Sequence, residues 1–176
     1  NGITDNAPLK GGKGMLYEGG IRVPMIARWP GHTRAGSITR TPVITVDFLP
    51  TLAEIAKAKL PVKQIRDGVS FVDLLHGKDL PERSLFWHFP GYLEAYGRRG
   101  HWRTTPASAI RQGDWKLIEF FEDDRLELFH TGRDIGETRN LADAEPEVAK
   151  RLHALLVDWR TRVQAPMPTS TERKSP

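Results

Sequence analysis

The chain has 176 residues, of which 39% are hydrophobic and 27% charged, and it includes five tryptophans. A chain of this length and apolar content can bury a core of its own, which excludes an intrinsically disordered protein. It contains no cysteine, so it can supply neither a disulfide nor a thiolate. No apolar stretch approaches the roughly 20 residues of a membrane-spanning helix, and Asn1–Asp5 do not resemble the start of a signal peptide.

The formal net charge of +4 is unevenly distributed. Residues 1–63 hold nine basic and four acidic side chains, whereas residues 104–176 hold eleven and thirteen. A basic front can attract an anionic substrate or a nucleic acid, although an ordinary solvated surface has the same composition. The chain also lacks an initiator methionine. We therefore expect it to begin inside a longer protein.

The first half of the chain predicts loops and short helices. Residues 1–20 contain six glycines and no apolar periodicity, which indicates a loop with turns. Residues 21–29 predict a strand, although Pro24 cannot donate to a ladder. A helix is expected from Asp47, since apolar residues follow on one helical face, and a short helical piece over 70–75.

The second half predicts a small antiparallel sheet and one long helix. Strands are expected over residues 84–89, 108–111, 115–121 and 126–130, the last two joined by a turn at Asp123 and Asp124. A helix from Pro146 to about Arg162 carries one apolar stripe. The stripe consists of Val148, Leu152, Leu155, Leu156, Trp159 and Val163. The tail, residues 166–176, has no apolar pattern.

The segment from Pro8 to Pro24 is the one that indicates chemistry. Lys13 stands between glycines, which lets its ammonium group and nearby backbone N–H groups approach an oxyanion closely. The segment matches neither of two common phosphate-binding motifs. A Walker A loop needs a glycine where Ala7 stands and a serine or threonine where Gly14 stands. A dinucleotide-binding fingerprint needs its third glycine where Tyr17 stands. From the spacing alone, the segment could also be a flexible glycine loop that has no function.

The same segment, together with Ala27–Gly31, resembles the stretch that sulfatases of the alkaline-phosphatase-like superfamily carry after their last metal-binding motif. Further similarities follow in order at residues 47–52, 67–71, 113–118, 127–129 and 136–141. The resemblance covers the chain to about residue 165. It implies an α/β fold for the whole protein and an α+β arrangement for this part. Residues 1–80 would form the last strand and helix of the catalytic domain. Residues 81–165 would form a four-stranded antiparallel sheet with a helix packed on it.

For the site, the resemblance implies that Lys13 binds sulfate oxygens. It also makes Asn1 a Ca²⁺ ligand at the end of an Asp-Asn-Gly motif, with Asp5-Asn6 as a rival position. The formylglycine nucleophile, made from a cysteine or serine in a Cys/Ser-x-Pro-x-Arg motif, has no match in this sequence. We therefore expect the remaining ligands and the nucleophile upstream, and the isolated chain to be inactive. A bacterial sulfatase would be periplasmic or secreted.

The sequence supports functional roles for some other residues less strongly. His88 and His101 could contact substrate, because the C-terminal part of a sulfatase borders the substrate pocket, although a lone histidine is more often structural. Glu18 and Arg22 could pair or support the lysine loop. The basic and aromatic segment 98–103 suits a sulfated small molecule or glycan better than a nucleic acid, for which no binding fold is recognisable. The alternatives are a phosphodiesterase or phosphonate hydrolase of the same superfamily, and a non-catalytic glycan-binding domain.

Overall fold

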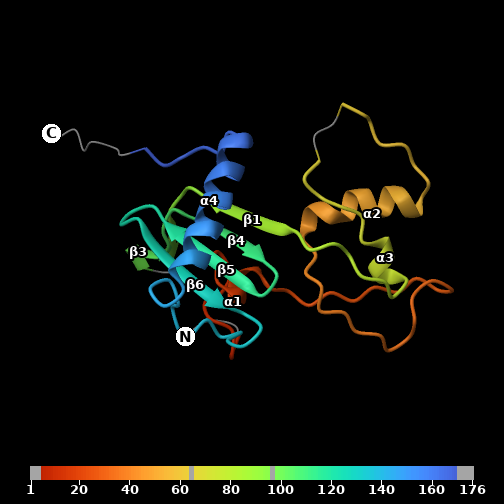
Figure 1. Cartoon of the computed structure of the whole chain (residues 1–176), viewed down its shortest axis with the longest axis horizontal. Coiled ribbons are helices and arrows are strands. Elements are labelled where there is room, and N and C mark those ends of the chain that lie inside the picture. The colour runs from red at the N-terminus through yellow and green to blue at the C-terminus, as the bar shows by residue number, and fades with distance from the viewer. Residues whose placement is uncertain (1–4, 64–65, 96–97, 170–176) are drawn as a thin grey trace. The chain divides into compact units, whose positions relative to one another are not determined.

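The computed structural model describes residues 5–63, 66–95 and 98–169. The chain divides into two compact units (Figure 1). The first, here called the sheet unit, comprises Asn1–Val23 and Arg83–Pro176, and the second, the inserted unit, comprises Pro24–Glu82. The expected domains over 1–80 and 81–165, with a tail over 166–176, concern the whole protein and stay a prediction. No helix among the described residues has the length and apolar character needed to cross a membrane.

The sheet unit is built on a four-stranded antiparallel sheet with the order β1-β4-β5-β6. Its strands are β1 (Ser84–Phe89), β4 (Ala107–Gln112), β5 (Trp115–Phe120) and β6 (Arg125–His130). The predicted sheet is therefore confirmed. Gly113 and Asp124 take the left-handed backbone conformation that tight turns require, with φ of 56° and 52°, between β4 and β5 and between β5 and β6.

One face of the sheet is covered by α4 (Pro146–Arg162), which crosses the strands in Figure 1. Leu152 and Leu156 are fully buried against Ile110, Leu117 and Leu128. The ring of Trp159 stacks on that of Phe86 with centroids 4.8 Å apart. The predicted stripe is confirmed at these positions, because a helix with apolar residues every three to four positions buries that stripe against a sheet.

The opposite face of the sheet is covered by the start of the chain. The strand register places Ala107, Ala109, Ile118, Phe120 and Phe129 on this face, where they form a second buried cluster. Leu16 and Tyr17 pack against that cluster. A segment that precedes β1 by more than sixty positions thus completes the sheet unit.

The strand expected over residues 21–29 is wrong. Glu18–Ile21 form a single helical turn, α1, and the Arg22 N–H donates to the Glu18 carbonyl at 2.8 Å. No described residue forms strand pairing with residues 22–29, and Pro24 lacks the N–H group that such pairing needs. Val23 and Ile26 are 76% and 96% exposed, so the apolar run covers no core among the described residues.

A two-stranded hairpin appears where the sequence predicted no strand. β2 (Leu93–Ala95) pairs with β3 (Arg98–Thr104) in a register that shifts twice. The irregular register explains why the period-two alternation of a regular strand is missing from this sequence.

The inserted unit contains α2 (Phe48–Ile55), preceded by a 3₁₀ turn, η1 (Thr45–Asp47), and α3 (Val72–Leu75). The two predicted helices are thus confirmed; α2 begins one residue after Asp47, and α3 begins two residues later than expected. The buried carboxylate of Asp47 accepts hydrogen bonds from the N–H groups of Ile44 and Val69, at 2.8 and 3.0 Å. These bonds tie the start of α2 to the segment before α3.

Candidate functional site

Lys13 lies at the tip of a tight loop, here called the lysine loop, which comprises residues 8–17. The Met15 N–H donates to the Gly12 carbonyl at 2.9 Å, and Gly14 takes a left-handed conformation with φ of 91°. Lys13 is exposed, and its ammonium group forms neither an ion pair nor a hydrogen bond with any described residue. The loop therefore presents one free cation.

The loop is pressed directly against α1. The Gly19 N–H donates to the Lys10 carbonyl at 2.8 Å, and the Asn6 side-chain amide donates to the Gly19 carbonyl at 3.2 Å. A Cβ atom on Gly20 would lie 2.0 Å from the Met15 carbonyl oxygen. Only glycine permits so close an approach of two backbones. The position of the loop is therefore coupled to that of α1.

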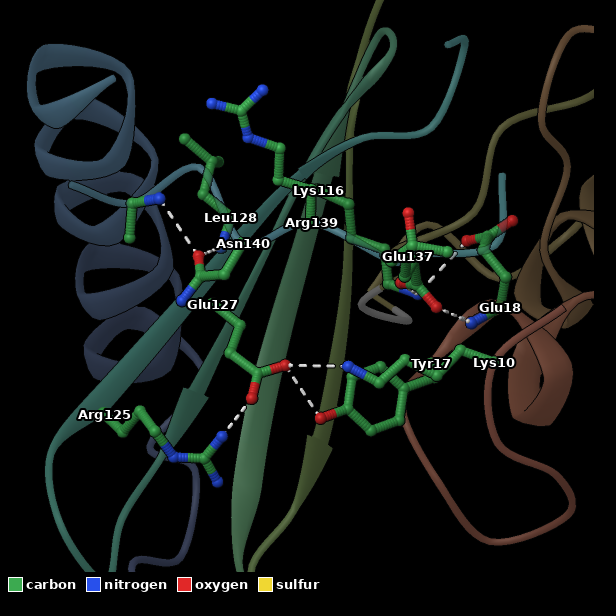
Figure 2. A network of polar contacts seen from close by, with 12 residues as sticks. Lys10, Tyr17, Glu18, Lys116, Arg125, Glu127, Leu128, Glu137, Arg139 and Asn140 are labelled. Carbon is green, nitrogen blue, oxygen red and sulfur yellow. Dashed lines mark hydrogen bonds and ion pairs between the residues drawn. The ribbon is translucent and has the colours of Figure 1, made fainter. Parts of the chain in front are cut away.

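Lys10, three positions before Lys13, is turned toward the sheet (Figure 2). Its ammonium lies 4.1 Å from the centroid of the Tyr17 ring and 3.5 Å from Glu127 Oε2. The Tyr17 hydroxyl donates to the same oxygen at 2.7 Å, and Arg125 pairs with the other oxygen of Glu127. Burial, with the hydrogen bond and charge of Glu127, raises the pKa of Tyr17. Tyr17 thus stays a neutral hydrogen-bond donor at any physiological pH.

A second polar network is fully buried beneath α1 (Figure 2). Lys116 of β5, which is 0% exposed, lies 3.1 Å from Glu18 Oε1 and 2.8 Å from Glu137 Oε1. The Glu18 N–H donates to Glu137 Oε2 at 2.6 Å. At the edge of the network, Arg22 and Arg111 lie 3.1 and 3.7 Å from Glu18 Oε2. The Glu18 and Arg22 pairing considered from the sequence is therefore present.

The two buried carboxyl groups respond differently to this environment. Burial alone would raise the pKa of Glu18, but Lys116, Arg22 and Arg111 outweigh it and hold that pKa below its ordinary value. For Glu137 burial prevails over the attraction of Lys116 and raises its pKa. Glu18 is thus the more firmly ionised partner of Lys116.

The β2–β3 hairpin lies beside the tip of the lysine loop. The Arg103 guanidinium donates to the Lys13 carbonyl at 3.1 Å, and a Cβ atom on Gly14 would lie 2.2 Å from Leu93 Cδ2. Between loop, hairpin and sheet there is an open hollow of about 180 Å³. It is lined by Met15, Leu16, Tyr17, Trp102, Arg103, Thr104, Thr105, Ala107, Ile118 and Phe120. The lining is mainly apolar, with Arg103 as its one cation.

The two histidines singled out from the sequence lie in different places. His88 lies in β1 on the face covered by α4, opposite the lysine loop, with Nδ1 2.6 Å from Ser108 Oγ and Nε2 2.7 Å from the Pro166 carbonyl. These contacts give it a structural role. His101 is exposed on β3, in the hairpin that contacts the loop. Substrate contact stays a prediction for both.

The expected calcium ligand, Asn1, lies outside the described residues. Of the rival pair, Asp5 accepts a hydrogen bond from the Ala7 N–H at 2.9 Å, and the Asn6 amide is engaged in the loop. Within the described part of the chain, no group of three or more histidine, aspartate or glutamate side chains could hold a metal ion. The described residues therefore do not fit a calcium site by themselves.

Sequence reasoning included Arg103 in the segment 98–103 but missed the roles of Lys116 and Glu137. One signal for Lys116 was available, because in β5 it lies two and four positions before Ile118 and Phe120, and so on the same inward-facing side of the strand. A lysine at such a position needs a buried anionic partner. The sequence did not indicate which carboxylate would supply it.

Comparisons with known proteins identify the family of this chain. The profile of the family described as N-sulphoglucosamine sulphohydrolase, C-terminal, matches residues 12–162. A sulfatase from Formosa agariphila is 38% identical over 181 residues, which is 94% of this chain and 32% of that protein. Human steryl-sulfatase is 38% identical over 115 residues, which is 65% of this chain and 19% of its own length.

Among solved structures, that of Ps i-CgsB in complex with k-i-k-neocarrahexaose is 28% identical with a TM-score of 0.70, covering 88% of this chain and 32% of its own. The expected fold class is thereby confirmed. The chain spans about a third or less of the length of these relatives. The chain belongs to the sulfatases, within the C-terminal family of the N-sulphoglucosamine sulphohydrolases.

Proposed function

We propose that the whole protein is a sulfuric ester hydrolase in which Lys13 binds the sulfate group. The observation that carries the proposal is the contrast between two neighbouring lysines. Lys10 is engaged by Tyr17 and Glu127, whereas Lys13 is exposed at the tip of a loop that is fixed on both sides. A fixed backbone that presents one unpaired cation is suited to an anionic ligand.

The proposed role of Lys13 follows from the charge that develops during cleavage. When the S–O bond of a sulfate ester breaks, negative charge grows on the leaving and nonbridging oxygens. An ammonium group held in place stabilises that charge without reorganisation of the site. A lysine ammonium has three donors and no acceptor, so it acts as an electrostatic stabiliser of the transition state.

The nucleophile and most metal ligands would come from outside the described residues. The sequence contains no cysteine and no Cys/Ser-x-Pro-x-Arg motif, so we propose that a formylglycine is supplied by another part of the whole protein. Ca²⁺ is the proposed metal, with Asn1 as one ligand, because an amide oxygen suits this hard cation. When bound, Ca²⁺ would supply positive charge next to the sulfate oxygens.

The proposed substrate is a sulfated small molecule or a sulfated glycan. The hollow beside the lysine loop supports this class, because Arg103 supplies the cation of its lining and Trp102 adds an aromatic face. Aromatic faces stack on sugar and aryl rings. We place the part of the substrate next to the sulfate in this hollow, with exposed His101 on the same hairpin.

Turnover assays of the whole protein test this function. We expect release of inorganic sulfate from 4-nitrophenyl sulfate, loss of activity with EDTA and recovery with Ca²⁺. Preferential hydrolysis of bis(4-nitrophenyl) phosphate or a phenylphosphonate ester would instead indicate the phosphodiesterase or phosphonate hydrolase alternative. Binding of sulfated glycans without turnover, in a protein whose reading frame lacks the formylglycine motif, would indicate the non-catalytic alternative.

A further inference from the structure

We propose that Lys116 is a positioning residue that holds Lys13 in its catalytic place through α1. This inference rests on the proposed function of Lys13. Lys116 lies in β5 on the face that the lysine loop covers, and it is 0% exposed. It cannot touch a substrate, so any influence on turnover passes through its two carboxylate partners.

The first step of the coupling joins the sheet to α1. Lys116 lies 3.1 Å from the Glu18 carboxylate and 2.8 Å from that of Glu137. Glu137 in turn accepts the Glu18 N–H at 2.6 Å. Glu18 is thus held twice: its side chain by Lys116, and its backbone by Glu137, the other partner of Lys116.

The second step joins α1 to the lysine loop. Gly19 and Gly20 directly follow Glu18, and they pack backbone to backbone on residues 10–15 without room for a methyl group. The hydrogen bond from the Gly19 N–H to the Lys10 carbonyl, at 2.8 Å, fixes their alignment. A displacement of Glu18 is therefore transmitted to the loop that carries Lys13.

The ammonium charge is what keeps this arrangement together. Without it, two buried carboxyl groups would face each other with no cation between them, since Arg22 and Arg111 contact only the outer oxygen of Glu18. Repulsion or protonation would then move Glu18 away from Glu137. A shift of about 1 Å in a catalytic group can lower a rate by about a hundredfold.

The test is a double-mutant cycle in the whole protein, with kcat referred to the folded fraction measured by circular dichroism. We expect Lys116→Met to lower kcat on 4-nitrophenyl sulfate by about tenfold to a hundredfold. In a Lys13→Ala background the same substitution should change kcat by less than about threefold, because residues that act through one group are not additive. A purely structural lysine would not produce this coupling.

Glu119→Gln is the matched control. Glu119 pairs with Arg160 and His153 on the sheet face covered by α4, away from the lysine loop. The Glu119→Gln substitution should lower the melting temperature, while kcat and the effect of Lys13→Ala on kcat stay unchanged.

If Lys116→Met does not fold, Glu137→Gln replaces it, since this variant keeps an acceptor for the Glu18 N–H. We expect it to lower kcat by about tenfold and to show the same coupling.

Two outcomes would overturn the proposal. One is an unchanged kcat in the folded Lys116→Met or Glu137→Gln protein. The other is an equal reduction in the presence and absence of the Lys13 side chain. Failure of the proposed function appears differently, as a Lys13→Ala variant with normal kcat or a protein that releases no sulfate.

Discussion

Lys10 and Lys13 lie on one loop, yet the ammonium of Lys10 is 3.5 Å from Glu127 Oε2 while Lys13 is exposed without a partner among the described residues. The Lys10 contacts hold the loop to the sheet. Two residues of the same type thus have different tasks: one is part of the scaffold, and the other is available to a ligand.

The first prediction concerns Lys13→Ala in the whole protein. Loss of one preorganised cation should lower kcat by about 10² to 10³, with little loss of stability because Lys13 fills no core space. Lys13→Arg should restore little activity, since a planar guanidinium cannot replace a compact ammonium between two glycines. Steady-state kinetics measure both. A Lys13→Ala variant with kcat within about threefold of wild type would show that the loop is not part of the site.

The second prediction concerns the pH dependence of stability. The folded chain holds the pKa of Glu18 below its ordinary value, so its stabilising effect is present above about pH 4.3 and is lost as the pH falls. Glu18→Gln should therefore lower the free energy of unfolding by about 3 kcal/mol at pH 7 and by less at pH 3.

Urea unfolding followed by tryptophan fluorescence at both pH values measures the effect of Glu18. The control is Glu82→Gln, which alters an exposed carboxyl group and should change stability by less than about 0.5 kcal/mol at either pH. A Glu18→Gln loss of the same size at pH 3 and pH 7 would contradict the assigned ion pairs.

The third prediction concerns the contact between α1 and the lysine loop. A Cβ atom on Gly20 would lie 2.0 Å from the Met15 carbonyl oxygen and 2.6 Å from that of Gly12. Gly20→Ala should therefore displace the loop, with a loss of about 1 to 3 kcal/mol in stability and a strong decrease in sulfate release. Gly91→Ala is the matched control, because its new methyl group would meet only Phe89 at 3.9 Å. Equal activity of the two variants would argue against the tight packing.

The fourth prediction concerns α4. Leu152 is 0% exposed, so Leu152→Ala should destabilise the sheet unit by about 2 to 5 kcal/mol through lost contacts and a cavity. Val157, on the same helix, is 40% exposed, and Val157→Ala should have a much smaller effect. Thermal unfolding of both variants measures the difference. Similar losses would mean that the buried side of the helix is assigned incorrectly.

The sheet and α4 could be predicted from the sequence because their information is local. Each strand carries a short apolar run ended by turn residues, and α4 has apolar positions at helical spacing after a first-turn proline. The same local reasoning failed over residues 21–29. There an apolar run resembles a strand, but a strand also needs a neighbouring strand to pair with, and no described residue pairs with this run in that way.

The candidate site was predictable only in part. Lys13 could be found because glycines on both sides of a lysine mark a close backbone approach. The network that holds its loop joins Glu18, Lys116 and Glu137, whose separations along the chain exceed any local pattern. A single amino-acid sequence contains no pattern that identifies such distant pairs. The inward position of Lys116 in β5 predicts that a buried carboxylate lies next to it, but it does not identify which residue supplies that carboxylate.

The hydrogen bond between Glu18 and Glu137 joins residues 119 positions apart. During synthesis from the N-terminus, the lysine loop leaves the ribosome long before β5 and Glu137, so its anchoring partners do not yet exist. Contacts of such long range form slowly, since the entropy of closing the intervening chain must be overcome first. The loop is thus translated before the partners that anchor it, and it becomes ordered only after them. A nascent chain that stops before Glu137 presents this segment, unanchored, to chaperones and proteases.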